Sequence, residues 1–240
     1  MLLLMTAVLC VACCASLRSE DGPRYRHVYN SGTVNGQSLD WAIGIPYSYE
    51  KETPAPLILS LHFGGTPTDH YGATFTNLLV LPALHEVGAI ILSPTCPVDL
   101  DWRSEIMEGA ILALIDSVRT QYSIDDDRIL VTGFSFGGIG TWYYAGMHPE
   151  IFSAAIPIAS RVTEDFLVNI DDIPIYVIHS TADEVLPSSE IVERVDTLKM
   201  RGADITLLLI NGVSHYETGA FVNPLKNSIA WLREHWSHNP

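Results

Sequence analysis

A serine flanked by two glycines is the strongest chemical signal in the sequence. Gly133-Phe134-Ser135-Phe136-Gly137 has the Gly-x-Ser-x-Gly spacing of a nucleophile elbow, in which a strand turns sharply into a helix. Glycines suit both positions because a Cβ there would collide with the neighbouring backbone. The serine hydroxyl then stands exposed at a helix N-terminus, which favours negative charge. The spacing predicts acyl transfer through Ser135; the alternative is a glycine-rich turn with a structural serine.

A serine hydroxyl needs a base to take its proton, and the base needs an anionic partner. Asp183 follows an expected strand at Ile175–His179, and His215 follows an expected strand at Ile205–Ile210. Because ligands gather at the carboxyl ends of parallel strands, we expect both side chains to meet Ser135 there.

Other residues compete for these roles. Asp183 can also be interpreted as a turn or N-cap residue, and His215 as an ordinary surface histidine. The other candidate acids are Glu184, Asp165, Asp171 and Asp172. Among the other histidines, His179 is interpreted as a packing residue at a strand end, and His235 and His238 as parts of a polar tail.

Acyl transfer also needs donors for the charge that develops on the carbonyl oxygen. The first expected donor is the backbone N–H of Phe136, directly after the serine. The second is expected in the loop Leu61-His62-Phe63-Gly64-Gly65, from the N–H of either Phe63 or Gly64. The alternative interpretation of the paired glycines is a simple flexible loop.

The elements that must hold these residues alternate along the chain. Apolar runs predict buried strands, and apolar residues at helical spacing predict helices between them, which together favour a mostly parallel sheet covered on both faces. Strands are expected at Leu57–Phe63, Ala89–Ser93, Ile129–Phe134, Ala154–Ala159, Ile175–His179 and Ile205–Ile210. Helices are expected at Thr76–Val87, Glu105–Tyr122, 139–147, Ser188–Met200 and Asn223–Trp236.

The remaining segments are less regular. Tyr25–Tyr49 is expected to form antiparallel strands with turns at Asn30-Ser31-Gly32 and Asn35-Gly36. Arg161–Asp172 is the least regular stretch and is interpreted as a small cap over the site. We therefore expect one α/β domain over residues 28–238, preceded by a polar lead-in at 16–27.

The first fifteen residues are apolar and carry no charged side chain. They suit a secretory signal segment, which predicts an exported protein, periplasmic or secreted. A second interpretation is lipidation at Cys13. If this segment is removed, only Cys96 remains, and a lone cysteine forms no internal disulfide.

The composition narrows the partners. The chain has 240 residues and a formal net charge of −15, which argues against nucleic acid and anionic membrane surfaces. We expect no metal, because the N-terminal cysteines have no spaced histidine partner.

At this point the chain resembles the α/β-hydrolase family over about residues 40–236. The resemblance rests on Leu-His-Phe-Gly-Gly at 61–65, on Gly-Phe-Ser-Phe-Gly-Gly at 133–138 and on the loops that hold Asp183 and His215. The segment 124–135 is similar to single-domain esterases related to feruloyl esterases, polyhydroxybutyrate depolymerases and dienelactone-hydrolase-like proteins. This implies the α/β-hydrolase fold and a cofactor-free hydrolase of small-molecule or polymer-derived carboxylic esters.

One departure concerns the second oxyanion donor. The relatives commonly carry His-Gly where this chain has His62-Phe63, so the ring could narrow the acyl site or shift the donor. Trp102 and Phe136 are predicted to contact substrate, although Trp102 could instead pack on the adjacent helix. The alternative functions are a serine peptidase of prolyl-oligopeptidase type and a non-catalytic binding protein.

Overall fold

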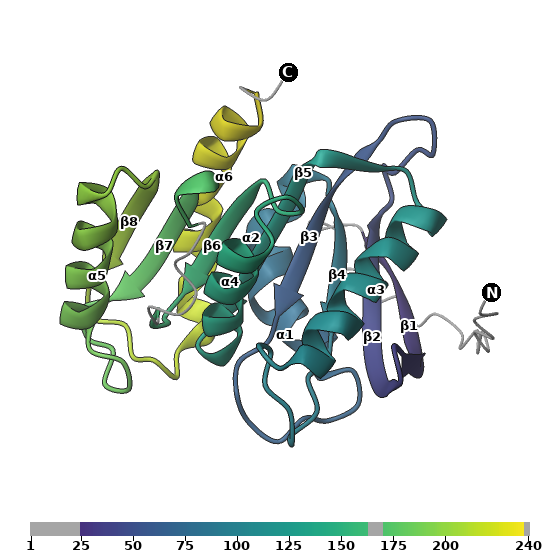
Figure 1. Cartoon of the computed structure of the whole chain (residues 1–240), viewed down its shortest axis with the longest axis horizontal. Helices are drawn as coiled ribbons and strands as arrows, with labels where there is room; N and C mark the ends of the chain where they lie inside the picture. The colour runs from purple at the N-terminus through teal and green to yellow at the C-terminus, as the bar shows by residue number, and fades with distance from the viewer. Residues whose placement is uncertain (1–24, 163–169, 238–240) are drawn as a thin grey trace.

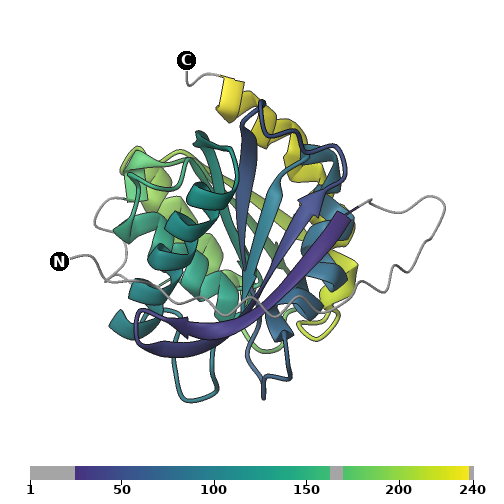
Figure 2. The same ribbon diagram turned by 90° about the vertical axis from the view of Figure 1, so that its right-hand side faces the viewer.

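The chain folds around one eight-stranded sheet with helices on both faces (Figures 1 and 2). The structure is a computed structural model that describes residues 25–162 and 170–237. The strand order is β1-β2-β4-β3-β5-β6-β7-β8, in which β1 and β2 are antiparallel to their neighbours and the other strands are parallel. The predicted fold class is confirmed.

The strands are β1 Tyr25–Val34, β2 Gln37–Pro46, β3 Ala55–Leu61, β4 Ile90–Pro94, β5 Ile124–Phe134, β6 Ala154–Ile158, β7 Ile175–Ser180 and β8 Ile205–Ile210. The helices are α1 Tyr71–Phe75, α2 Leu81–Leu84, α3 Glu105–Gln121, α4 Phe136–Met147, α5 Ser188–Met200 and α6 Val222–Ser237. Shorter π and 3₁₀ turns are η1 Thr76–Val80, η2 His85–Val87, η4 Ile170–Asp172 and η5 Thr218–Phe221.

The central strands are apolar on both sides because each faces a separate core. In β3, Leu57 and Leu59 pack into the core with α3, α4 and α5, whereas Ile58 between them packs into the core with α1, α2 and α6. Alternate side chains of a strand therefore pack against the helices on opposite faces of the sheet. The ends of the parallel strands lie along one edge between these two layers of helices.

The N-terminal hairpin confirms one predicted turn and corrects the other. Asn35 and Gly36 both have positive φ, 47° and 83°, as a two-residue turn of type I′ requires. The expected turn at Asn30-Ser31-Gly32 is wrong, because these residues lie within β1. A Cβ on Gly32 would make only an ordinary contact, at 3.6 Å, with the Trp41 ring on the neighbouring strand.

The helix expected at Thr76–Val87 begins earlier and is divided. Helical structure starts at Tyr71 and runs through α1, η1, α2 and η2 to Val87. Pro82 lies in the first turn of α2, where its missing N–H costs no helical hydrogen bond, and the π-turn η1 precedes that turn.

Several predictions fall on residues outside the described ranges. These are the signal segment 1–15, residues 16–24 of the lead-in, Asp165 and most of the cap at Arg161–Asp172, and His238. Tyr25–His27 belong to β1 and not to a lead-in, because β1 pairs with β2 from Tyr25 onward.

Candidate active site

Ser135 occupies a sharp strand-to-helix turn between β5 and α4. Its backbone angles are φ 54° and ψ −113°, a region that side chains rarely adopt, and its N–H donates to the Ile158 carbonyl at 2.9 Å. A Cβ on Gly133 would lie 2.7 Å from the Leu61 carbonyl oxygen, and one on Gly137 would overlap the same oxygen. The two glycines are therefore required by the contact between this turn and β3.

Three side chains from three strand ends meet in one line. The His215 ring lies with Nε2 2.8 Å from Ser135 Oγ and with Nδ1 2.7 Å from Asp183 Oδ2. Because an ionised carboxylate only accepts, Nδ1 carries the proton and donates to Asp183, which leaves Nε2 free to accept from the serine hydroxyl. The predicted convergence of these residues is present in the structure.

Asp183 is held by its own loop. The side chain is fully buried, and Oδ1 accepts hydrogen bonds from the backbone N–H groups of Val185 and Leu186 at 3.0 and 2.7 Å. These bonds leave Oδ2 directed at His215. His179, fully buried behind the carboxylate, donates from Nε2 to the Leu186 carbonyl at 2.9 Å, and burial lowers its pKa.

The other described candidate acids lie elsewhere. Asp171 faces Arg201 at 3.5 Å, and Asp172 lines a pocket at the opposite end of the sheet. Glu184 is next to Asp183 but contacts the backbone of the histidine loop and not the imidazole.

Glu184 joins the two loops that carry Asp183 and His215. Its Oε2 accepts from the backbone N–H of His215 at 3.0 Å, and its Oε1 accepts from the Ser214 hydroxyl at 2.5 Å. Both hydrogen bonds lower the pKa of Glu184, and the bond from the Ser214 hydroxyl has the larger effect. Sequence reasoning considered Glu184 only as a substitute acid, because the backbone contact depends on how the two loops fold together.

The loop after β3 lies beside the serine turn. His62 is buried; its Nε2 accepts from the Cys96 N–H at 2.9 Å, so its Nδ1 carries the proton and donates to the Phe63 carbonyl at 2.7 Å. A Cβ on Gly64 would lie 3.6 Å from the Cβ of Phe136, which shows how closely this loop approaches the start of α4.

The Phe63 ring is turned into an aromatic cluster below the loop. It meets Tyr71 and Phe75 edge-on at 5.6 Å each, and it meets Phe134 at 6.3 Å. Phe134 in turn lies 5.4 Å from the His215 ring. The Phe63 ring therefore anchors its loop to the core and lies beside Phe134, which packs against the His215 ring.

Trp102 does not line the site, which corrects the prediction that it contacts substrate. Its side chain is 0% exposed, since it packs between α4 and the loop after β3. Its Nε1–H donates to the His62 carbonyl at 3.2 Å, and its own carbonyl accepts from the Tyr144 hydroxyl at 3.0 Å. Phe136, partly buried and 6.3 Å from the Trp102 ring, remains a candidate for substrate contact.

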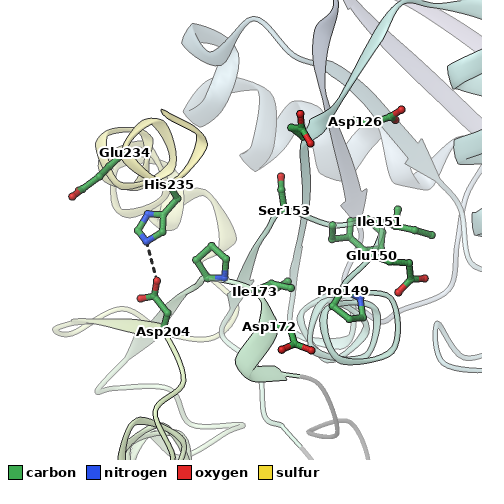
Figure 3. A pocket seen from close by; sticks show the side chains of 13 residues that line it. Asp126, Pro149, Glu150, Ile151, Ser153, Asp172, Ile173, Asp204, Glu234 and His235 are labelled. Carbon is green, nitrogen blue, oxygen red and sulfur yellow. Dashed lines mark hydrogen bonds and ion pairs between the residues drawn. The ribbon is translucent and has the colours of Figure 1, made fainter. Parts of the chain in front are cut away.

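A separate pocket of about 510 Å³ lies at the amino ends of the strands (Figure 3). Acidic side chains from β5, η4, α6 and the loops before β6 and β8 line it, and His235 faces Asp204 there at 3.1 Å. Asp126, which lines this pocket, lies near the start of β5, whereas Ser135 follows the end of β5. The pocket is therefore about the length of β5 away from the serine.

The described residues offer neither a metal-binding cluster nor a membrane-spanning helix. Residues 25–162 and 170–237 contain no group of three or more His, Cys, Asp or Glu placed to hold a metal ion. No helix in those ranges combines the length and apolar character needed to cross a bilayer.

The sheet order and the helical layers define an α/β-hydrolase. The sequence model of the phospholipase/carboxylesterase family matches residues 102–233, and the chain belongs to this family. Protein usf from Aquifex pyrophilus is 25% identical over 129 residues, which cover 53% of this chain and 54% of that protein.

Two further similarities concern esterases. The probable feruloyl esterase C of Aspergillus terreus is 26% identical over 189 residues, which cover 77% of this chain and 70% of that protein. A crystal structure of a thermostable esterase has a TM-score of 0.74 at 25% identity, over 87% of this chain and 62% of that chain. The chain spans about half the length of the Aquifex pyrophilus relative.

Proposed function

We propose that this chain is a serine hydrolase that cleaves carboxylic esters through an acyl-enzyme on Ser135. The observation that carries the proposal is the hydrogen-bonded line from Ser135 through His215 to Asp183. Membership of the phospholipase/carboxylesterase family supports the same chemistry.

In the proposed reaction, Ser135 Oγ attacks the ester carbonyl while His215 Nε2 takes the hydroxyl proton. The buried Asp183 carboxylate stabilises the imidazolium that forms. His215 then gives the proton to the leaving alcohol, and the acyl group stays on Ser135. Water, activated by the same imidazole, releases the acid and restores the serine.

Two backbone N–H groups are proposed to bind the oxyanion, and the first is that of Phe136 at the start of α4. For the second, the peptide planes favour Gly64 over Phe63. In a trans peptide the N–H points opposite to the preceding carbonyl. The His62 carbonyl points toward α4, since a Cβ on Gly137 would lie 2.6 Å from it, so the Phe63 N–H points away. The Phe63 carbonyl points back at the buried His62 ring, so the Gly64 N–H points outward.

The test is turnover of p-nitrophenyl esters by Ser135→Ala. We expect activity to be lost, because no other group replaces the nucleophile. Ser117→Ala, which changes a serine in the middle of α3, should keep full activity. Unchanged turnover by Ser135→Ala would refute the proposal.

The same protein also distinguishes the alternative functions. Ester hydrolysis is expected to exceed hydrolysis of peptide nitroanilides, and the reverse order would favour a peptidase. A fluorophosphonate probe should label the wild type and not Ser135→Ala. Failure to label the folded wild type would favour a non-catalytic binding protein.

A further inference from the structure

A buried indole holds the loop that carries the proposed second oxyanion donor. Trp102 lies in the loop between β4 and α3, and its Nε1–H donates to the His62 carbonyl at 3.2 Å. Its ring lies 4.9 Å from the His62 ring and 6.3 Å from that of Phe136. One side chain therefore lies against both segments from which the donors come, the loop after β3 and the first turn of α4.

The hydrogen bonds around His62 fix the two carbonyls of this loop. Trp102 engages the carbonyl of His62, and the His62 ring engages the carbonyl of Phe63. The ring itself is oriented by the Cys96 N–H, and burial lowers the pKa of His62 to about 4, so the ring is neutral at ordinary pH. Because each peptide is a rigid plane, fixing a carbonyl also fixes the direction of the next N–H.

We propose that Trp102 is a positioning residue of the oxyanion hole. It holds His62 through the bond to the His62 carbonyl and through ring packing, and the His62 ring in turn holds the Phe63 carbonyl and so orients the Gly64 N–H. The proposal rests on the proposed ester hydrolysis. It assigns Trp102 no contact with substrate, because its side chain is fully buried. Loss of its N–H should therefore impair stabilisation of the tetrahedral intermediate and leave substrate binding almost unchanged.

The protein offers a matched control for the indole N–H. Trp142 on α4 is also fully buried and packs in the same core, but its Nε1 has no hydrogen-bond partner among the described residues. Trp102→Phe and Trp142→Phe thus make the same chemical change, and only the first removes a hydrogen bond to the loop.

We expect Trp102→Phe to lower kcat for p-nitrophenyl butyrate by at least about tenfold, with KM within about twofold of the wild type. Removing a donor outright costs on the order of 100-fold or more, and a displaced donor loses part of that. Trp142→Phe should change neither constant more than about twofold. Near-UV circular dichroism verifies that both variants are folded, and equal kinetics of the two folded variants would overturn the proposal.

A second variant decides the matter if Trp102→Phe does not fold. Tyr144→Phe removes the hydroxyl that holds the Trp102 carbonyl, and it should lower kcat more weakly without raising KM. Wild-type kcat in Tyr144→Phe would then overturn the proposal. The Ser135→Ala assay distinguishes failure of the proposed function from failure of the Trp102 proposal. Activity in Ser135→Ala would refute the proposed function itself. If Ser135→Ala is inactive and Trp102→Phe keeps the wild-type kcat, only the role of Trp102 is refuted.

Discussion

Ser135 carries a backbone conformation that its own side chain opposes. A non-glycine residue at φ 54° and ψ −113° costs on the order of 1–3 kcal/mol, and the hydrogen bond to Ile158 and the packing of β5 against α4 maintain it. This strained backbone conformation directs the Ser135 hydroxyl toward His215. The orientation of the hydroxyl is therefore obtained at the expense of folding stability.

This strain predicts an unusual order of stability among variants. Ser135→Gly should be more stable than Ser135→Ala by about 1 kcal/mol, because both lack the hydroxyl and only glycine tolerates these angles. Urea unfolding of the two variants measures the difference. At Ser117 in the middle of α3 the order should reverse, since alanine is favoured over glycine in a helix by about 1 kcal/mol. Equal stability of the two Ser135 variants would contradict the strain.

At the scale of elements, the site is assembled from loops that follow β3, β5, β7 and β8. Glu184 connects two of these loops by accepting hydrogen bonds from the His215 backbone and the Ser214 hydroxyl. The loop that supplies the acid therefore also fixes the loop that supplies the base.

We expect Glu184→Ala to lower kcat several-fold, because the His215 loop loses an anchor while the Asp183 contact remains. The effect stays moderate since Glu184 is exposed and its hydrogen bonds compete with water. Steady-state kinetics with p-nitrophenyl butyrate provide the measurement. Glu193→Ala, on the exposed surface of α5, is the control, and the idea fails if the two variants are indistinguishable.

Sequence reasoning located the three side chains of the line because each follows an apolar strand, and parallel strands bring their carboxyl ends to one edge. It left Trp102 open between substrate contact and packing on the adjacent helix, because its position after β4 is the same whether the ring faces solvent or the His62 carbonyl. It missed the helical start at Tyr71, where the π-turn before Pro82 has no composition signal. Hydrogen bonds to backbone carbonyls depend on tertiary packing, which no spacing reveals.

At the scale of the whole molecule, burial affects three histidines in different parts of the fold. The pKa values of His27, His62 and His179 are all lowered, and desolvation is the largest cause for each. In the unfolded chain these groups return toward a pKa of about 6.5. Unfolding therefore takes up protons, and the stability that the neutral histidines contribute is complete above about pH 6.5.

We expect the free energy of unfolding to fall as the pH is lowered from about 7 toward 4. Each histidine that binds a proton only when unfolded contributes a slope of up to about 1.4 kcal/mol per pH unit. Urea titrations at four pH values measure the slope. His179→Gln, which keeps a donor for the Leu186 carbonyl, should give a shallower slope, and a flat profile in the wild type would contradict the prediction.

The pocket beside Asp204 and His235 places the last turn of α6 at the amino ends of the strands, whereas Ser135, Asp183 and His215 follow the carboxyl ends (Figures 1 and 3). A bead or electrode coupled to that turn of the helix would thus hold the molecule by its far side. Ester dissolved in the surrounding liquid would still reach the nucleophile unobstructed, so immobilised protein should work nearly as fast as free protein.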